Sequence, residues 1–310
     1  MKKRLHFYIV GGVLLIAIIL GSFFDLQINA ALFDRYNGFG LAISAFGMIP
    51  GYGTLTFLGG VLFALTFKNK QFPVWLRVIF HIVSVALYGV AVYFLGRDVF
   101  GVNGFESKQI FWLGFLIMGL VNIPIAYLGY WLGKKNTYPK MWIAVLVLGV
   151  AMFMALVPFT TLLKSIMHRP RYRIAVFENF VDFHNWWEPT KNYNDLISAS
   201  AGALTKEEFK SYPSGHACAT ACSMIMLSYI PVLDKRLMKY QPYFFYGGFV
   251  WTLLMMFCRM LVGAHYLTDV AFGALITVIM FFIANEVNVR VLLKEESPVE
   301  EKPAEEPVNE

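Results

Sequence analysis

The chain has 310 residues, of which 58% are hydrophobic and only 15% charged, and its mean hydropathy is +0.58. This composition excludes a soluble globule of that size, because too few polar side chains are available to cover its surface. The formal net charge of +6 does not indicate nucleic-acid binding. Lys and Arg are concentrated in short segments between apolar runs, where they favour cytoplasmic orientation and contact anionic lipids. We therefore expect a membrane protein.

Eight apolar runs can cross the hydrocarbon core of a bilayer, which is about 30 Å thick and needs about 20 helical residues. The second run contains Pro50, Gly51 and Gly53, which are expected to break or kink its helix. The pattern predicts an all-α fold, a polytopic bundle of about eight transmembrane helices. The spans are expected at residues 7–24, 41–66, 74–96, 110–133, 141–163, 217–233, 243–262 and 266–287.

The charges in the connections between spans predict the orientation, because Lys and Arg near span ends favour the cytoplasm. They precede the first span and occupy the connections after the second, fourth and sixth spans. The alternate connections, the first of which is expected to include Asp25, carry mixed charge. Both termini should then lie inside, a placement compatible with a bacterial cytoplasmic membrane. The orienting residues are Lys2, Lys3, Arg4, Lys68, Lys70, Arg77, Lys134, Lys135, Lys140, Lys235, Arg236 and Lys239.

The connection over residues 164–216 is far longer than a link between two spans requires. Its aromatic residues recur at partly helical spacing, which indicates an amphipathic segment on the membrane surface. For this segment, contact with substrate and a lid that only packs on the span ends are equally favoured. We interpret the chain as one structural domain. It comprises N-terminal transmembrane helices over 1–140, a catalytic core over 141–290 and an acidic, disordered tail over 291–310. The aromatic residues are Phe177, Phe180, Phe183, Trp186 and Trp187.

Three groups of chemically active residues flank the last four spans, and the predicted topology brings all three to the outer side. The first group follows span five, the second opens span six, and the third joins spans seven and eight. Ionisable side chains at span ends are costly unless they serve a function. The groups are Lys164, His168, Arg169, Arg171 and Arg173; Pro213, Ser214, Gly215 and His216; and Arg259, His265 and Asp269.

This set of side chains suits a phosphoryl group better than Mg²⁺ or Zn²⁺, because it holds several cations, two histidines and one carboxylate. The three cysteines of the chain show no CxxC spacing, so neither a metal site nor a disulfide framework is indicated. His265 and Asp269 are four residues apart, so the carboxylate can hold the imidazole in one tautomer while its other nitrogen attacks phosphorus. His216 is placed to protonate the departing oxygen. Ser214 and Gly215 would present backbone N–H groups to phosphate.

These residues resemble the three-part signature of the type 2 phosphatidic acid phosphatase (PAP2) superfamily of lipid phosphatases. The first part, Lys, six residues and Arg-Pro, matches Lys164 and Arg171. The second, Pro-Ser-Gly-His, matches residues 213–216 in full. The third, Ser-Arg, five residues, His, three residues and Asp, matches Arg259, His265 and Asp269. The resemblance covers the region from the fifth to the eighth span and implies that the PAP2-type core lies in the C-terminal half.

The resemblance implies a role for each matched residue and needs no metal or cofactor. His265 would be the nucleophile that forms a phosphohistidine, Asp269 its orienting partner and His216 the general acid. The remaining matched residues, Lys164, Arg171, Ser214, Gly215 and Arg259, would hold phosphate.

Two positions depart from the family pattern. Tyr172 stands in place of the motif proline, and the preceding Arg169 and Pro170 offer an alternative register, so both arginines are candidates for phosphate binding. Cys258 replaces the serine before Arg259. A thiol is a weaker donor than a hydroxyl, so we expect reduced affinity there rather than loss of activity.

The leading hypothesis is a metal-independent membrane phosphatase whose lipid substrate comes sideways from the outer leaflet. Candidate substrates are phosphatidic acid, phosphatidylglycerol phosphate and undecaprenyl diphosphate. A lipid phosphotransferase would use the same residues. The alternative from another class is a non-enzymatic lipid-phosphate binder or transporter, which would not require both histidines. The sequence indicates no nucleic-acid partner and leaves the oligomeric state open.

Overall fold

The computed structural model describes residues 4–67, 72–101, 108–177 and 181–293. Residues 294–310 lie outside this part, so the expectation of a disordered tail applies there to residues that the structure does not describe. The same holds for Phe180 in the long loop and for four of the orienting lysines, Lys2, Lys3, Lys68 and Lys70. Residues 291–293, expected to begin the tail, instead continue the last helix.

The described residues form an all-α bundle with eight helical segments long and apolar enough to cross a membrane, which confirms the expected fold class. Several spans consist of two helices in sequence. The helices are α1 (Leu5–Leu32), α2 (Gly38–Phe46), α3 (Ile49–Phe67), α4 (Val74–Gly96), α5 (Lys108–Gly133), α6 (Met141–Met154), α7 (Thr160–Met167), α8 (Tyr193–Ala199), α9 (Gly215–Ala221), α10 (Ser223–Leu233), α11 (Gln241–Leu261) and α12 (Leu267–Leu293).

The second span is broken as the sequence predicts, although the break falls slightly earlier. The helix stops at Gly47 and Met48, and α3 begins at Ile49 with Pro50 in its first turn. Proline is tolerated there because the first N–H groups of a helix have no partner within it. Pro158 has a related effect in the fifth span, where a π-helical turn separates α6 from α7.

The first span is longer than its apolar run, and this corrects the placement of Asp25. We expected the span to end at residue 24, with Asp25 in the connection that follows. Instead α1 continues to Leu32, and Asp25 and Asn29 are both buried within it. Because the hydropathy pattern stops at the first charge, it underestimates a helix whose polar residues face other protein groups.

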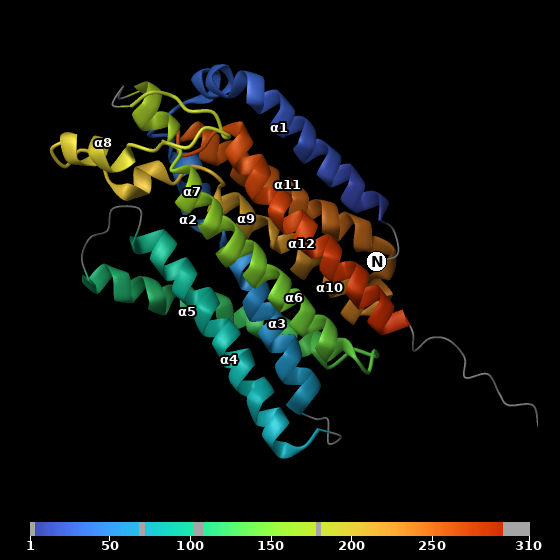
Figure 1. Ribbon diagram of the computed structural model, residues 1–310. Coiled ribbons are helices and arrows are strands. Elements are labelled where there is room, and N and C mark those ends of the chain that lie inside the picture. Colours follow the sequence, from blue (N-terminus) through green and yellow to red (C-terminus); the bar gives the residue numbers. More distant parts are fainter. Residues whose placement is uncertain (1–3, 68–71, 102–107, 178–180, 294–310) are drawn as a thin grey trace, which may run out of the picture.

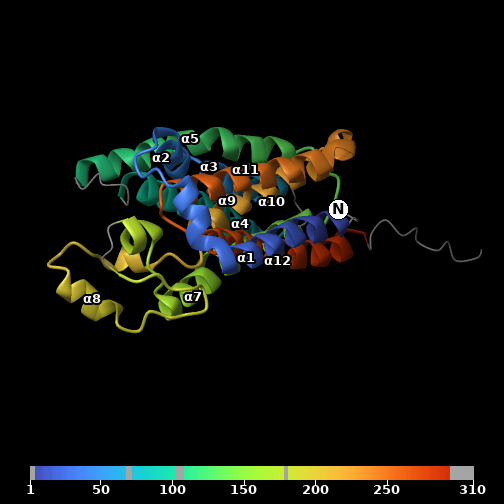
Figure 2. The same cartoon turned by 90° about the horizontal axis from the view of Figure 1, so that it is seen from above.

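The helices run roughly alongside one another, with the α7 and α8 region at one end and the N-terminus at the other (Figures 1 and 2). Helix α1 packs along α12, whereas α4 and α5 pack on α3. At the N-terminal end the charged connections meet, since Lys135 forms an ion pair with Asp234 at 3.0 Å. The opposite end gathers the connections that follow α1, α7 and α11. Which end faces the cytoplasm stays a prediction.

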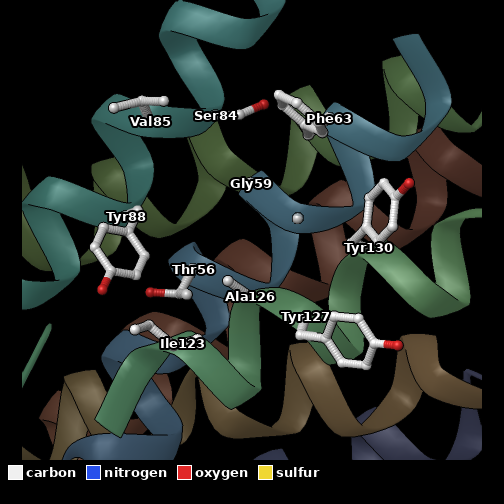
Figure 3. A pocket seen from close by; sticks show the side chains of 11 residues that line it. Thr56, Gly59, Phe63, Ser84, Val85, Tyr88, Ile123, Ala126, Tyr127 and Tyr130 are labelled. Atoms are coloured by element: carbon white, nitrogen blue, oxygen red, sulfur yellow. The ribbon is translucent and has the colours of Figure 1, made fainter. Parts of the chain in front are cut away.

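Helix α3 approaches its neighbours closely through glycine. A Cβ atom at Gly51 would lie only 2.1 Å from the Ala219 carbonyl oxygen, and one at Gly60 only 2.2 Å from the Ala126 carbonyl oxygen. Small residues permit such contact between helix backbones in membranes. Beside the contact at Gly60, residues of α3, α4 and α5 line a hollow of about 430 Å³ (Figure 3). None of the predicted site residues lines it.

Candidate active site

The three predicted groups of residues meet at the end of the bundle where the long loop lies. The His216 and His265 rings are 6.5 Å apart between centroids. Arg171 reaches the same place, because its Nη1 atom lies 3.4 Å from the Ala264 carbonyl oxygen. Lys164 extends toward Gly215, where a Cβ atom would lie 3.6 Å from its Nζ atom. Residues separated by up to about 100 positions in sequence therefore share one site.

The tautomer of His265 is set by a backbone carbonyl. Its Nδ1 atom lies 2.7 Å from the carbonyl oxygen of Ser211. A carbonyl oxygen only accepts hydrogen bonds, so Nδ1 carries the proton and Nε2 keeps a free lone pair. Asp269 Oδ2 is 3.8 Å from the same nitrogen, which is close enough for an ion pair but too far for a hydrogen bond. The direct hydrogen bond expected between His265 and Asp269 is thus replaced by one to Ser211.

The His265 side chain is almost completely buried, with 1% of the residue exposed. Burial disfavours the charged imidazolium and lowers the pKa of His265 to about 3. The connection that holds the ring turns sharply at Gly263, whose φ of +66° is rarely adopted by residues with a side chain. His265 is therefore held neutral, with one nitrogen available as a nucleophile.

Asp269 acts on His265 through its neighbours. Its Oδ2 atom accepts hydrogen bonds from the Ser211 hydroxyl and from the backbone N–H of Tyr266, the latter at 2.9 Å. Its Oδ1 atom accepts from Arg169 Nη1 at 2.7 Å. The carboxylate thus fixes the residues on either side of the imidazole, namely the one that accepts from Nδ1 and the one that follows His265 in the chain.

Arg169 is fully engaged within the protein. Its guanidinium donates to Asp25 and Asp269, to the Thr268 hydroxyl, and to the carbonyl of His184 at 2.8 Å. Burial alone would lower the pKa of Arg169, but the two carboxylates raise it above the ordinary value. Because Arg169 is 0% exposed and four of its five N–H donors are occupied, it is unsuited to phosphate binding.

Arg171 is the better candidate of the two arginines left open by the sequence. Its Nε atom donates to the Glu207 carbonyl at 3.0 Å, which orients the guanidinium without neutralising it. Burial, followed by the charge of Arg173, lowers the pKa of Arg171. An incoming anion would relieve both effects. Arg173 itself is paired with Glu208 at 2.6 Å.

Other polar groups at the site are left without partners among the described residues. The buried Nε atom of Arg259 has no hydrogen-bond acceptor. Within the part of the chain that the structure describes, neither the Lys164 ammonium nor the His216 ring forms a hydrogen bond or ion pair. A buried N–H donor without an acceptor is costly, so the gathering of Arg259, Arg171 and Lys164 around His265 indicates a site for an anion.

The Pro-Ser-Gly-His turn is fixed on both sides. The Ser214 hydroxyl accepts from the backbone N–H of Ala217 at 3.4 Å and so caps α9. The Ser214 backbone N–H donates to the Asp269 carbonyl at 2.9 Å. Gly273, one turn further along α12, allows this approach, because a Cβ atom there would lie 2.2 Å from the Ser214 carbonyl oxygen. The turn that carries His216 is thereby anchored to the helix that carries Asp269.

Comparison with protein families matches residues 140–290 to the PAP2 superfamily. The chain belongs to this superfamily. PAP2 proteins are generally phosphatases, which supports hydrolysis of a phosphoester as the class of reaction. No curated protein and no solved structure matches the chain.

The two departures from the PAP2 pattern are accommodated by packing. Tyr172, in place of the motif proline, is buried with its ring edge against Phe33, at 5.2 Å between ring centroids, and close to Tyr266. It therefore fills space between the end of α1 and the connection that holds His265. Cys258 is fully buried in α11 beside Arg259.

The long loop of this PAP2 protein differs from the amphipathic helix that its aromatic spacing indicates. Residues 181–190 form bends and turns without a helix. Trp186 donates to the Ser22 hydroxyl at 2.9 Å and packs on Phe272, and Phe183 packs on Tyr266. Phe183 and Trp186 thus pack on the span ends, as the lid interpretation predicts. The aromatic spacing does not correspond to one helical face here, because Phe183 and Trp186 contact different segments of the bundle.

Four residues that support this PAP2 site were not predicted, namely Asp25, Asn29, Ser211 and Thr268. None belongs to the three-part signature, and Asp25 and Asn29 lie outside the matched region. One feature of the sequence could have indicated Asp25. It is the single charged residue between Leu5 and Leu32, a stretch that is otherwise uncharged.

Proposed function

We propose that the protein is a metal-independent phosphatase that hydrolyses a lipid phosphate or diphosphate through a phosphohistidine at His265. The observation that carries this proposal is the neutral imidazole of His265 at the place where Lys164, Arg171 and Arg259 gather. Lys164, Arg171 and Arg259 would neutralise phosphate oxygens, as preorganised cations do in phosphoryl transfer. Gly215 would add a hydrogen bond from its backbone N–H at the start of α9, and Ser214 one from its hydroxyl, because the expected Ser214 backbone N–H already donates to the Asp269 carbonyl.

In the first step, the His265 Nε2 lone pair attacks phosphorus and the bond from phosphorus to the bridging oxygen breaks. The electron pair of that bond leaves with the oxygen, which takes a proton from the His216 imidazolium. The two rings are 6.5 Å apart, so both can contact one phosphoryl group without contacting each other. Positive charge that develops on His265 is stabilised by the nearby Asp269 carboxylate.

In the second step, water attacks phosphorus and the bond from phosphorus to Nε2 breaks. His216, now neutral, accepts the proton that water loses, and inorganic phosphate leaves. His216 returns to its protonated form and His265 to its neutral form. His216 thus acts first as acid and then as base, His265 remains the nucleophile, and water is the only further reactant.

Support for a lipid substrate comes from the position of the site. The catalytic residues lie at the ends of membrane-spanning helices, and Trp186 and Phe272 pack beside them. Aromatic rings favour the interface between headgroups and hydrocarbon, where lipid phosphates lie. We propose that this end of the bundle faces the extracytoplasmic side and that the substrate comes from that leaflet. Phosphatidic acid, phosphatidylglycerol phosphate and undecaprenyl diphosphate are the candidates.

The test is phosphate release by purified protein in EDTA, with the three lipids offered in parallel. Wild type should hydrolyse one of them, while His265→Ala and His216→Ala should lose most activity. Gly247→Ala is a matched control, because an added Cβ at that helical glycine meets nothing within 4 Å. Activity that strictly requires Mg²⁺, or that survives in His265→Ala, would contradict the proposal.

The same experiment separates two related functions. A phosphotransferase would form the phosphohistidine with little phosphate release, and addition of an acceptor alcohol would yield the phosphorylated alcohol in place of inorganic phosphate. A binder or transporter would retain the lipid without forming a phosphoenzyme. Acid-labile labelling of His265 by a ³²P-labelled lipid therefore distinguishes catalysis from binding.

A further inference from the structure

Asp25 is a carboxylate buried in the first membrane span, with 4% of the residue exposed. It lies outside residues 140–290, which carry the PAP2 match. An ionisable side chain within a span is costly and usually serves a function there. The contacts of Asp25 indicate what that function is.

Asp25 caps a helix that belongs to the active site. Its Oδ1 atom accepts from the backbone N–H of Thr268 at 3.1 Å, and its Oδ2 atom accepts from the Thr268 hydroxyl. Thr268 is the second residue of α12, and the first N–H groups of a helix have no acceptor within the helix. Asp25 supplies that acceptor from α1, directly beside Asp269.

A second residue of α1 holds the nucleophile. Asn29, one turn after Asp25, donates from Nδ2 to the His265 carbonyl at 2.9 Å. Close approach of the helices depends on Gly21, where a Cβ atom would lie 2.8 Å from Thr268 Cγ2. Helix α1 therefore contacts both the backbone of His265 and the first turn of α12.

Asp25 also sets the charge near His265. Arg169 lies between two carboxylates, with Asp25 Oδ2 at 3.0 Å and Asp269 Oδ1 at 2.7 Å. Together the three side chains carry a net charge of minus one. Without Asp25, Arg169 and Asp269 would form a neutral pair. The net negative charge of this group would then be absent, although it is needed when the imidazole becomes positive during attack on phosphorus.

We propose that Asp25 is a positioning residue for the nucleophile and acts through Arg169, Asp269 and the first turn of α12. This inference rests on the proposed function, in which His265 attacks phosphorus. It gives the first helix, which lies outside the matched catalytic region, a direct role in the phosphatase site.

The test compares wild type with Asp25→Asn, Arg169→Gln and the double variant. Asn288→Ala is the matched control, because Asn288 makes buried contacts between helices, to Ala144 and Tyr229, near the far end of α12. Asp25→Asn should lower kcat roughly 10- to 100-fold with little change in KM, as loss of an orienting partner does. Asn288→Ala should lower Tm without lowering kcat. In the Arg169→Gln background, Asp25→Asn should cause little further loss, because the two residues act as a unit.

Two outcomes would overturn the inference. One is a kcat for Asp25→Asn that stays at the wild-type value while Tm falls as in the control. The other is a full, additive loss in the Arg169→Gln background. Modification of His265 by diethyl pyrocarbonate, followed by mass spectrometry, gives a readout that needs no turnover. Slower modification in Asp25→Asn than in Asn288→Ala would support the positioning role of Asp25. This holds even if wild type hydrolyses none of the lipids, because missing hydrolysis would contradict only the phosphatase proposal.

Discussion

His265 donates a hydrogen bond from Nδ1 to the backbone carbonyl of Ser211 at 2.7 Å, and this bond leaves Nε2 unprotonated, as the proposed nucleophile requires. Because the acceptor is a backbone atom, no side-chain substitution removes it directly. Asp269 supports the arrangement from 3.8 Å by binding the Ser211 hydroxyl. The tautomer of His265 therefore depends on the path of the chain as well as on the motif aspartate.

A first prediction concerns Ser211→Ala. The substitution keeps the carbonyl but removes the hydroxyl that ties Ser211 to Asp269. We expect kcat to fall roughly 10- to 100-fold, which is less than in His265→Ala, because the tautomer is preserved while its support is weakened. Steady-state kinetics on the lipid that wild type hydrolyses would measure this. A loss as large as that of His265→Ala would show that Ser211 has a direct catalytic role.

A second prediction concerns pH. The nucleophile must be unprotonated, and burial lowers the pKa of His265 to about 3, compared with about 6.5 in the unfolded chain. Protonation of His265 should therefore cause no decrease in kcat/KM between about pH 7 and about pH 5. Ionisation of the substrate, measured separately by ³¹P NMR, must first be corrected for. An acid limb near pH 6.5 that remains after this correction would contradict the assignment.

The same shift affects stability in a defined direction. Below about pH 6.5 the unfolded chain binds a proton at His265 more strongly than the folded protein does. The free energy of unfolding should therefore decrease as pH falls from about 6.5 toward the folded-state pKa. Thermal unfolding of wild type and His265→Ala, measured across that range, would isolate the contribution, because the variant lacks this group.

The sequence predicted the eight spans and the three motifs because these features are local. A hydropathy run or a fixed spacing such as that from His265 to Asp269 is visible without knowing which helices touch. Asp25, Asn29 and Ser211 were missed because their roles arise from contacts between distant segments. Likewise, only the four donor contacts of Arg169 could show that Arg171 is the arginine better suited to phosphate.

A third prediction separates these two arginines. Arg171→Gln should weaken inhibition by inorganic phosphate roughly 10- to 100-fold, the equivalent of about 1.5–3 kcal/mol for a hydrogen bond to a charged group. Arg169→Gln should instead destabilise the fold by about 3–5 kcal/mol, because Asp25 and Asp269 would be left buried without their cation. Phosphate inhibition and thermal unfolding of both variants give the comparison. A reversed pattern would assign phosphate to Arg169.

A fourth prediction tests His216 as the general acid. His216→Ala should lower kcat about 10²- to 10⁴-fold for a lipid phosphate monoester, whose alcohol is a poor leaving group. With p-nitrophenyl phosphate the first-turnover release of nitrophenolate should fall much less, because nitrophenolate leaves without a proton, although hydrolysis of the phosphohistidine still requires His216 as base. His265→Ala, which removes the nucleophile, should lose activity on both substrates. Equal losses in the first-turnover rate of His216→Ala on the two substrates would assign His216 to phosphate binding instead.

A fifth prediction concerns the contact between α12 and the Pro-Ser-Gly-His turn. In Gly273→Ala the added methyl group would overlap the Ser214 carbonyl oxygen, which lies 2.2 Å from its position. Because both atoms belong to buried backbone segments, the turn must move away from α12, at a cost of about 1–3 kcal/mol. His216 would move with it, so kcat should fall together with Tm. Gly247→Ala, whose methyl group meets nothing within 4 Å, should leave kcat unchanged. Full activity in Gly273→Ala would mean that the position of His216 does not depend on this contact.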